Sequence, residues 1–169
     1  MGKISFIKKL YNYLGGLQKI LLVIALSIML FNVTLGVFYR YVLNNSLSWT
    51  EEVARYLMIW FGFIGMGVAM KDERHVGITV IRDLFSEKVT LYLKIISNIL
   101  IMIFLIYIFR ASVKHMSILK FQTSPAVGIN MRWPYFSVTF GSVLMMIENL
   151  KQFIDNILGL KNIIQTTNE

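Results

Sequence analysis

Four long stretches of the chain contain no charged residue, and they set its pattern of hydrophobic and polar positions. The first has 20 residues and the other three have 15 each: 20–39, 56–70, 95–109 and 133–147. A helix of about 20 residues crosses the hydrocarbon core of a bilayer. A soluble helix would carry a polar stripe along one face, and these stretches show none. The pattern predicts membrane-spanning helices.

The flanking residues lengthen the three shorter stretches into full crossings. Each continues at helical spacing into neighbouring turns, and Lys or Arg at a helix end can extend its charge to the membrane interface. We therefore predict an all-α integral membrane protein that forms a single domain over residues 1–169. Its four transmembrane helices are expected at about 17–40, 49–70, 88–112 and 133–155.

Two further segments have the pattern of amphipathic helices that lie along a membrane surface. Apolar positions recur at helical spacing over residues 3–14 and again over 76–86, with charged residues opposite. Helices of this kind bury one face at the interface. Gly15 and Gly16 follow the first segment and predict a break before the first span. For the second segment, an ordinary helix in a connecting loop is the alternative.

Composition supports the membrane assignment and removes several other classes of protein. Apolar residues make up 56% of the chain and charged residues 15%, whereas an average soluble domain has about 25% charged residues. Cysteine is absent, which excludes disulfides and thiolate metal sites. His75 and His115 lie far apart, and no phosphate-binding loop, dinucleotide motif or catalytic triad is present. We expect no catalytic residue, cofactor or metal site in this chain.

The net charge of +8 follows the pattern of membrane topology rather than that of nucleic-acid binding. Eleven Lys and Arg residues lie in the N-terminal segment, the second loop and the tail, and six lie in the first and third loops. Because cytoplasmic segments are enriched in Lys and Arg, both termini are predicted in the cytoplasm. The third loop is then an outward-facing cationic segment without an acid. Either the third helix extends beyond Phe109, or this loop uses its positive charge.

A polar cluster at residues 48–56 precedes the second span. Ser48 and Glu51 have the spacing of a capping box, which places a helix start here. Glu51 and Glu52 lie four and three residues before Arg55, so both carboxylates can reach its guanidinium. A proton relay would need an acid deep in the bilayer, and this cluster lies at its edge. We interpret it as a cap or an interhelical clamp.

Small and polar residues within the spans indicate helix packing. Small residues favour close helix approach, and they recur along the second span at Gly62, Gly65, Gly67 and Ala69. Polar side chains can join helices by hydrogen bonds of about 0.6–2 kcal/mol each. In the first and third spans these are Ser27, Asn32, Thr34, Ser97 and Asn98.

The third loop ends in an irregular segment at residues 121–135. Pro125 and Gly128 interrupt regular structure there, and Trp133 suits the membrane interface. The segment is either a plain turn between helices or a docking surface. The candidate docking residues are Lys114, Lys120, Ser124, Pro125 and Arg132.

Two of these segments together resemble the small membrane subunit, or Q subunit, of tripartite ATP-independent periplasmic (TRAP) transporters of the DctQ type. The first is R-Y-V-L-N-N at residues 40–45 followed by W-x-E-E-x-x-R at 49–55, and the second is S-P-A-x-G-I at 124–129. The likeness extends over residues 21–150. Asn130 and Arg132 depart from it, because the family usually has Pro and an apolar or aromatic residue at these positions.

The resemblance implies a static scaffold in the bacterial inner membrane, embedded in the lipid bilayer and bound to a large M subunit. That M subunit would carry the substrate and sodium sites and move as an elevator. A periplasmic binding protein (P) would deliver an organic acid of the sialic acid or C4-dicarboxylate class. The cluster before and within the second span would then be a subunit interface or structural clamp: Trp49, Glu51, Glu52, Arg55, Tyr56, Gly62 and Gly65.

Two other functions are open at this point. A self-sufficient, proton-coupled small transporter would rely on a membrane-embedded carboxylate, and the first span has none. A membrane anchor subunit of another complex, such as a haem-carrying enzyme, would need His ligands within its spans. No feature of the sequence indicates a nucleic-acid partner.

Overall fold

The computed structural model of the chain describes residues 2–71 and 86–167, and for residues 2–12, 14, 162, 164, 166 and 167 it describes the backbone only. Within these residues the protein is all-α, which confirms the predicted fold class. Its helices are α1 (Gly2–Tyr41), α2 (Ser48–Lys71), α4 (Glu87–Leu119) and α5 (Arg132–Thr167). Three of them are long and apolar enough to cross a membrane: α1 over Gly15–Tyr41, α2 and α4.

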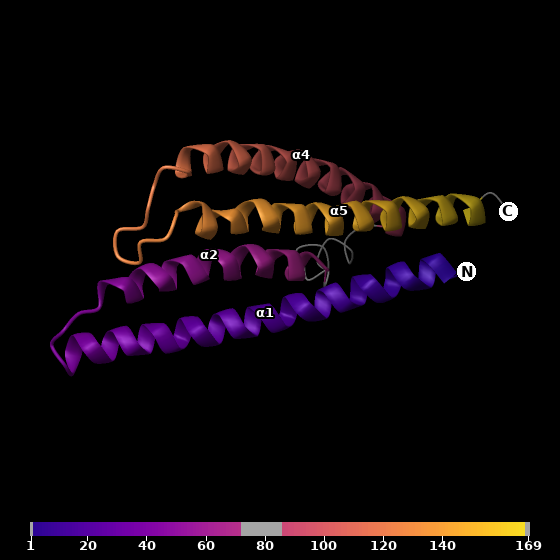
Figure 1. Cartoon of the computed structure of the whole chain (residues 1–169). Helices are drawn as coiled ribbons and strands as arrows, with labels where there is room; N and C mark the ends of the chain where they lie inside the picture. Colours follow the sequence, from indigo (N-terminus) through magenta and orange to yellow (C-terminus); the bar gives the residue numbers. More distant parts are fainter. Residues whose placement is uncertain (1, 72–85, 168–169) are drawn as a thin grey trace.

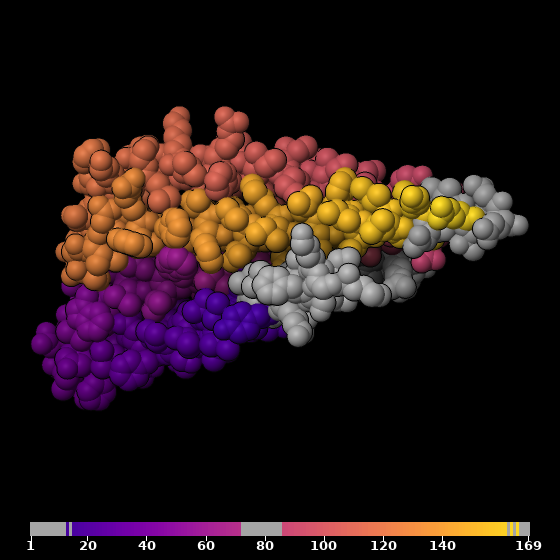
Figure 2. All heavy atoms as spheres, turned by 45° about the vertical axis from the view of Figure 1, so that its right-hand side comes forward, coloured from indigo at the N-terminus to yellow at the C-terminus, as the bar shows by residue number. Residues whose placement is uncertain are grey.

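The helices lie along one common direction (Figure 1): α1 runs antiparallel to α2, α4 runs antiparallel to α5, and α2 and α5 run parallel to each other. Among the described residues α1 packs against α2, α2 against α5, and α5 against α4, while α1 contacts neither α4 nor α5. On the face seen in Figure 2, α5 lies between α4 and the pair formed by α1 and α2. The two described loops, 42–47 and 120–131, lie at the end of the molecule opposite to both termini (Figure 1).

Helix α5 is the most interior element and the least apolar of the four. Ser137, Ser142 and Asn149 on this helix are fully buried at 0% exposure. Burial between α2 and α4 permits a polar helix at membrane depth, because polar side chains there can bond to neighbouring helices rather than face lipid. The predicted fourth crossing therefore rests on the length and placement of α5.

The predicted helix boundaries agree best for α2, whose bounds differ by one residue at each end. Helix α4 continues to Leu119, well past the predicted 112, so Arg110 and Lys114 stand on a helix and not in a loop. Extension of the third helix, one of the two readings of the cationic third loop, therefore accounts for these two residues. Helix α5 likewise continues past 155, to Thr167.

The predicted break at Gly15 and Gly16 is wrong, because α1 runs through both as one helix of 40 residues. A glycine inside a helix costs about 1 kcal/mol relative to alanine, which does not outweigh a long apolar helix. Gly15 is buried for a packing reason: a Cβ at this position would overlap the Lys71 side chain. The predicted surface helix at 3–14 is thus the start of α1, and the one at 76–86 lies almost wholly outside the described residues.

The closest approach at a glycine between α2 and α5 occurs at Gly141. A Cβ at this position would lie 2.6 Å from the Cβ of Phe63 and 2.9 Å from the Phe63 carbonyl oxygen. A core of Met70, Leu105 and Met145 joins α2, α4 and α5 nearby.

Candidate functional site

The carboxylate of Glu52 joins α2 to the loop between α4 and α5. Its Oε2 atom accepts hydrogen bonds from the backbone amides of Ala126 at 2.9 Å and Val127 at 3.0 Å. Its Oε1 atom accepts a hydrogen bond of 2.6 Å from the Tyr56 hydroxyl. Glu52 is only 8% exposed. Hydrogen bonds to an ionised acceptor are among the stronger ones, so this contact fixes the loop to the start of α2.

The loop residues fold into a turn whose amides point to one acceptor. The Gly128 amide donates to the Ser124 carbonyl at 3.0 Å, and the Ser124 amide donates to the Ile129 carbonyl at 2.8 Å. Pro125 provides a fixed φ for the turn, and Gly128 adopts φ +75°, which favours glycine. Successive free amides of such a turn make an anion-binding concavity. In this protein the anion is the Glu52 side chain.

The two sequence motifs therefore meet in space. Glu52 and Tyr56 come from the first motif, and the turn at 124–129 is the second. Ser124 was expected at a docking surface, but it is 3% exposed and its Oγ accepts a hydrogen bond from the Val127 amide at 3.1 Å. Pro125 remains exposed. The second motif is thus an internal structural element as well as a surface loop.

Glu51 pairs with Arg40 at the end of α1, not with Arg55. Among the described residues Arg55 makes no ion pair with Glu51 or Glu52, so the predicted intrahelical pairing is wrong. Both partners of the Arg40–Glu51 pair are about half exposed. The Arg40 guanidinium also donates to the Ser46 hydroxyl at 3.5 Å. The pair closes the loop between α1 and α2 rather than stabilising one turn of α2.

The predicted start of α2 is correct, but its cap differs from the expected capping box. Within the described chain no side-chain hydrogen bond from Ser48 caps the helix. Instead the Thr50 hydroxyl donates to the Leu47 carbonyl at 2.7 Å, and the Asn32 amide donates to the Thr50 carbonyl at 2.5 Å. The second bond links the C-terminal part of α1 to the first turn of α2.

The remaining residues of the first cluster face different surroundings. Tyr56 is buried beside Glu52, whereas Trp49 and Arg55 are exposed. Gly65 faces Leu22 of α1, where a Cβ would be in ordinary contact at 3.8 Å, while Gly62 has open space around it. The predicted small-residue face is therefore divided between packing inside the chain and an open surface.

Polar residues within the spans follow the prediction only in part. The Ser27 and Thr34 hydroxyls donate to carbonyls of their own helix, at 2.8 Å and 2.9 Å. The Asn32 side chain does join two helices, because its amide donates to the Thr50 carbonyl of α2. At Asn98 the contact is made by the backbone carbonyl, which accepts a hydrogen bond of 2.9 Å from the Asn149 amide of α5. Two buried residues of α5, Glu148 and Asn149, were not singled out from the sequence. The available signal was helical spacing, because Glu148 and Asn149 lie three to four residues after apolar residues of the last span and so continue the same helix faces.

The departures from the family motif fix the loop at 120–131 to α4. The Asn130 amide donates to the Lys120 carbonyl at 2.9 Å, and its Oδ1 accepts from the Arg132 backbone amide at 3.0 Å. The Arg132 guanidinium donates to the Met116 carbonyl at 3.0 Å. Lys120 lies over the ring of Phe121, which is largely exposed. Among the expected docking residues, Lys120 and Pro125 are therefore the most available.

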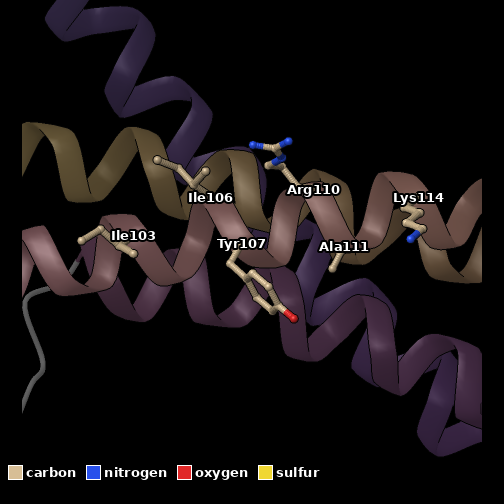
Figure 3. A pocket seen from close by; sticks show the side chains of 6 residues that line it. All are labelled: Ile103, Ile106, Tyr107, Arg110, Ala111 and Lys114. Carbon is tan, nitrogen blue, oxygen red and sulfur yellow. The ribbon is translucent and has the colours of Figure 1, made fainter.

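Lys114 lies apart from this loop, on the side of α4. It lines a shallow groove of about 650 Å³ with Arg110 and four uncharged residues, and Figure 3 shows that all of them come from α4. Within the described residues, no three His, Asp or Glu side chains gather as a metal site would require.

A row of long aligned helices, most of them suited to cross a bilayer and tied together by buried polar contacts, defines an all-α integral membrane protein. The family of the DctQ component of tripartite ATP-independent periplasmic transporters matches residues 18–159. The chain belongs to this family, which makes it a small permease component of a TRAP transporter.

Similar proteins agree with this membership. The small permease protein SiaQ of the sialic acid TRAP transporter of Vibrio cholerae is 26% identical over 149 residues, covering 88% of this chain and 86% of the relative. The ectoine TRAP transporter small permease protein TeaB of Halomonas elongata is 28% identical over 143 residues, covering 83% of this chain and 74% of the relative. The sialic acid TRAP transporter permease protein SiaT of Haemophilus influenzae is 24% identical over 84% of this chain, but the match covers only 22% of that longer protein.

Proposed function

We propose that this chain is the static scaffold subunit of a sodium-coupled TRAP transporter, and that it braces a large elevator-type M subunit. The observation that carries the proposal is that the acidic side chains at the start of α2 are bound by other groups of the same chain. The carboxylates of Glu51 and Glu52 are held by Arg40 and by the outer turn, which suits a rigid support rather than a transport path. The substrate and sodium sites would then belong to the M subunit, and this chain would need no cofactor of its own.

The longer relatives support a large membrane partner. SiaT and the isethionate TRAP transporter permease protein DctMQ of Oleidesulfovibrio alaskensis each match this chain over only 22% of their own length. In such proteins a segment similar to this chain is continuous with a much longer permease. A separate small chain would make the same contacts across a subunit interface.

The open stripe of α2 is the surface that we assign to the M subunit. It comprises residues that share one helix face and are exposed or border open space: Arg55, Met58, Gly62, Met66 and Ala69. A small residue in the middle of a mostly apolar stripe lets a partner helix approach closely. Gly62 is therefore expected at the centre of the interface.

Co-purification of the M subunit tests this assignment. Gly62→Trp is expected to leave the isolated chain folded, because the added side chain meets open space, and to reduce recovery of the M subunit several-fold. Gly16→Trp is the matched control, since Gly16 on α1 also has no atom within contact distance. Equal recovery with both variants would contradict the α2 interface. Failure of the unsubstituted chain to recover any large membrane subunit would contradict the scaffold function itself.

The transported solute is proposed to be an organic acid of the sialic acid or C4-dicarboxylate class, delivered by a periplasmic binding protein. The loop at 120–131 would contact that protein. Its exposed Lys120 would attract an acidic patch, and charge complementarity of this kind mainly raises the association rate.

Charge reversal tests the docking loop. Lys120→Glu is expected to slow uptake and to reduce its dependence on ionic strength. Lys161→Glu makes the same charge change near the opposite end of the molecule and is expected to have no effect. If both variants transport at the unsubstituted rate at every salt concentration, the loop does not attract the binding protein by charge.

A self-sufficient proton-coupled transporter is the alternative that one observation favours, because α5 carries the buried acid Glu148. Solute uptake by the purified chain alone in proteoliposomes, lost in Glu148→Gln, would support that alternative and contradict the scaffold.

A further inference from the structure

The outer half of α4 carries a groove that combines apolar walls with two cations. Its lining residues form two ridges on the same helix, one of Ile106, Arg110 and Lys114 and the other of Ile103, Tyr107 and Ala111. In Figure 3, Ile106 and Arg110 lie on one side of the helix and Tyr107 and Ala111 on the other. Rows of side chains four residues apart form such ridges on any helix. The small side chain of Ala111 leaves space between them.

Arg110 and Lys114 are cations without an acidic counterpart. They lie four residues apart on one helix face, where like charges destabilise a helix by about 0.2–0.5 kcal/mol. Among the described residues neither makes an ion pair, and the two described acids near this end of the molecule, Glu51 and Glu52, are already bound elsewhere. A bound anion would relieve this repulsion.

The position of the groove relative to the hydrocarbon core of the membrane indicates which class of anion it can bind. Residues 95–109 of α4 are free of charge and span about 22 Å of helix, so Arg110 stands near the boundary of a hydrocarbon core of about 30 Å. Lys114 lies about 6 Å further out, at the level of lipid headgroups. Below them Tyr107 is 71% exposed and Ile103 is 61% exposed. The groove thus offers cations at headgroup depth and apolar side chains at acyl-chain depth.

We propose that this α4 groove binds an anionic phospholipid. The guanidinium of Arg110 and the ammonium of Lys114 hold its phosphate, and one acyl chain lies between the two ridges against Ile106 and Tyr107. Arg pairs well with phosphate because its fork of N–H donors matches the phosphate oxygens. A soluble anion would gain nothing from the apolar part of the groove.

Thermal unfolding of the full chain in detergent, with phosphatidylglycerol or phosphatidylcholine of the same acyl chains added, tests the proposal. Phosphatidylglycerol is expected to raise the unfolding temperature by several degrees more than phosphatidylcholine. The double variant Arg110→Gln/Lys114→Gln is expected to lose most of this difference. The control Lys88→Gln/Lys94→Gln removes the same charge from the other end of α4 and is expected to retain it.

Two further measurements separate a bound lipid from a bound soluble anion. Ala111→Leu keeps both cations but fills the groove, and it is expected to reduce the effect of phosphatidylglycerol at least three-fold. Glycerol 3-phosphate, which has no acyl chains, is expected to give no shift. The proposal is overturned if the Arg110/Lys114 variant keeps the full shift, if both double variants lose it equally, or if glycerol 3-phosphate reproduces it. A wild-type chain indifferent to phosphatidylglycerol would also overturn it, and would point to an acidic residue of a partner protein.

Discussion

Two adjacent glutamates show how strongly surroundings decide the role of a residue. Glu51 is 59% exposed and pairs with Arg40 across solvent, whereas Glu52 is buried and bound by two backbone amides and a tyrosine hydroxyl. Exposed ion pairs contribute little to stability because water screens them and two long side chains lose freedom. A buried carboxylate that loses its charge leaves several donors poorly satisfied. The two residues are natural controls for each other.

Glu52→Gln is expected to lower the unfolding temperature of the chain in detergent by several degrees. A neutral amide accepts weaker hydrogen bonds than a carboxylate, and its NH₂ group replaces one of the two acceptor oxygens, facing either the backbone amides or the Tyr56 hydroxyl. The released loop should also become more sensitive to trypsin, which cleaves after Lys120 and Arg132. Both effects are measured on the same purified protein.

Glu51→Gln serves as the control for this change, because it removes one negative charge from the adjacent residue. It should leave the unfolding temperature nearly unchanged and the loop resistant. Similar losses in the two variants would mean that net charge at the start of α2 matters and that the bonds to the turn do not.

At the scale of single helices, packing sets positions that local pattern does not. The pair Gly15 and Gly16 favours a break by local pattern, yet α1 continues through both. Gly141 lies within a charge-free span and has no distinctive pattern around it, yet among the described glycines it is the one where α5 comes closest to the backbone of α2. The sequence pattern predicts how long the apolar part of a helix is. Whether a glycine ends a helix, or instead lets another helix pack closely against it, depends on which helix lies opposite.

Gly141→Ala is expected to destabilise the packing of α2 on α5 by about 1–3 kcal/mol, as overpacking does in a filled interior. The added methyl would clash with the backbone of Phe63, which cannot move away as a flexible side chain would. Equilibrium unfolding in mixed micelles measures the change. Gly62→Ala, where space is open, should instead gain about 0.5–1 kcal/mol from helix propensity. A neutral Gly141→Ala would show that the two helices separate easily.

At the scale of the whole molecule, the helices form a row in which α1 touches only α2 among the described helices. A closed bundle would hide most of its apolar surface, but this row leaves long apolar faces on α1 and α4 open. Such faces need lipid or a partner protein to cover them. The row is therefore suited to extend the surface of a larger membrane protein.

The orientation of the row can be tested directly because the chain has no cysteine. With both termini in the cytoplasm, single cysteines placed at Ser46 and Gln122 should react with a membrane-impermeant maleimide added to intact cells. A cysteine at Gln165 should react only after the membrane is opened. The reverse pattern would place the termini outside and would exclude contact between the loop at 120–131 and a periplasmic protein.

The fold class and the approximate positions of the helices could be predicted from the sequence, because both depend on residues close together in the chain. The two motifs, at 49–55 and 124–129, could be recognised for the same reason. The sequence did not predict that Glu52 binds the turn at 126–127 or that Glu51 selects Arg40 over Arg55, since these choices depend on how helices are placed in space. The buried Glu148 and Asn149 were missed for the same reason. Asn149 bonds to Asn98 of α4, and the spacing within α5 does not reveal which helix lies opposite.

The bond between Glu52 and Ala126 joins residues 74 positions apart. At about 5–20 residues per second, a ribosome makes Ala126 roughly 4–15 s after Glu52. During that interval the Ala126 and Val127 amides do not yet exist, and among the described residues the Tyr56 hydroxyl is the one protein partner that the carboxylate already has. We therefore expect the start of α2 to be fixed only late in biogenesis, by residues of the opposite half of the chain.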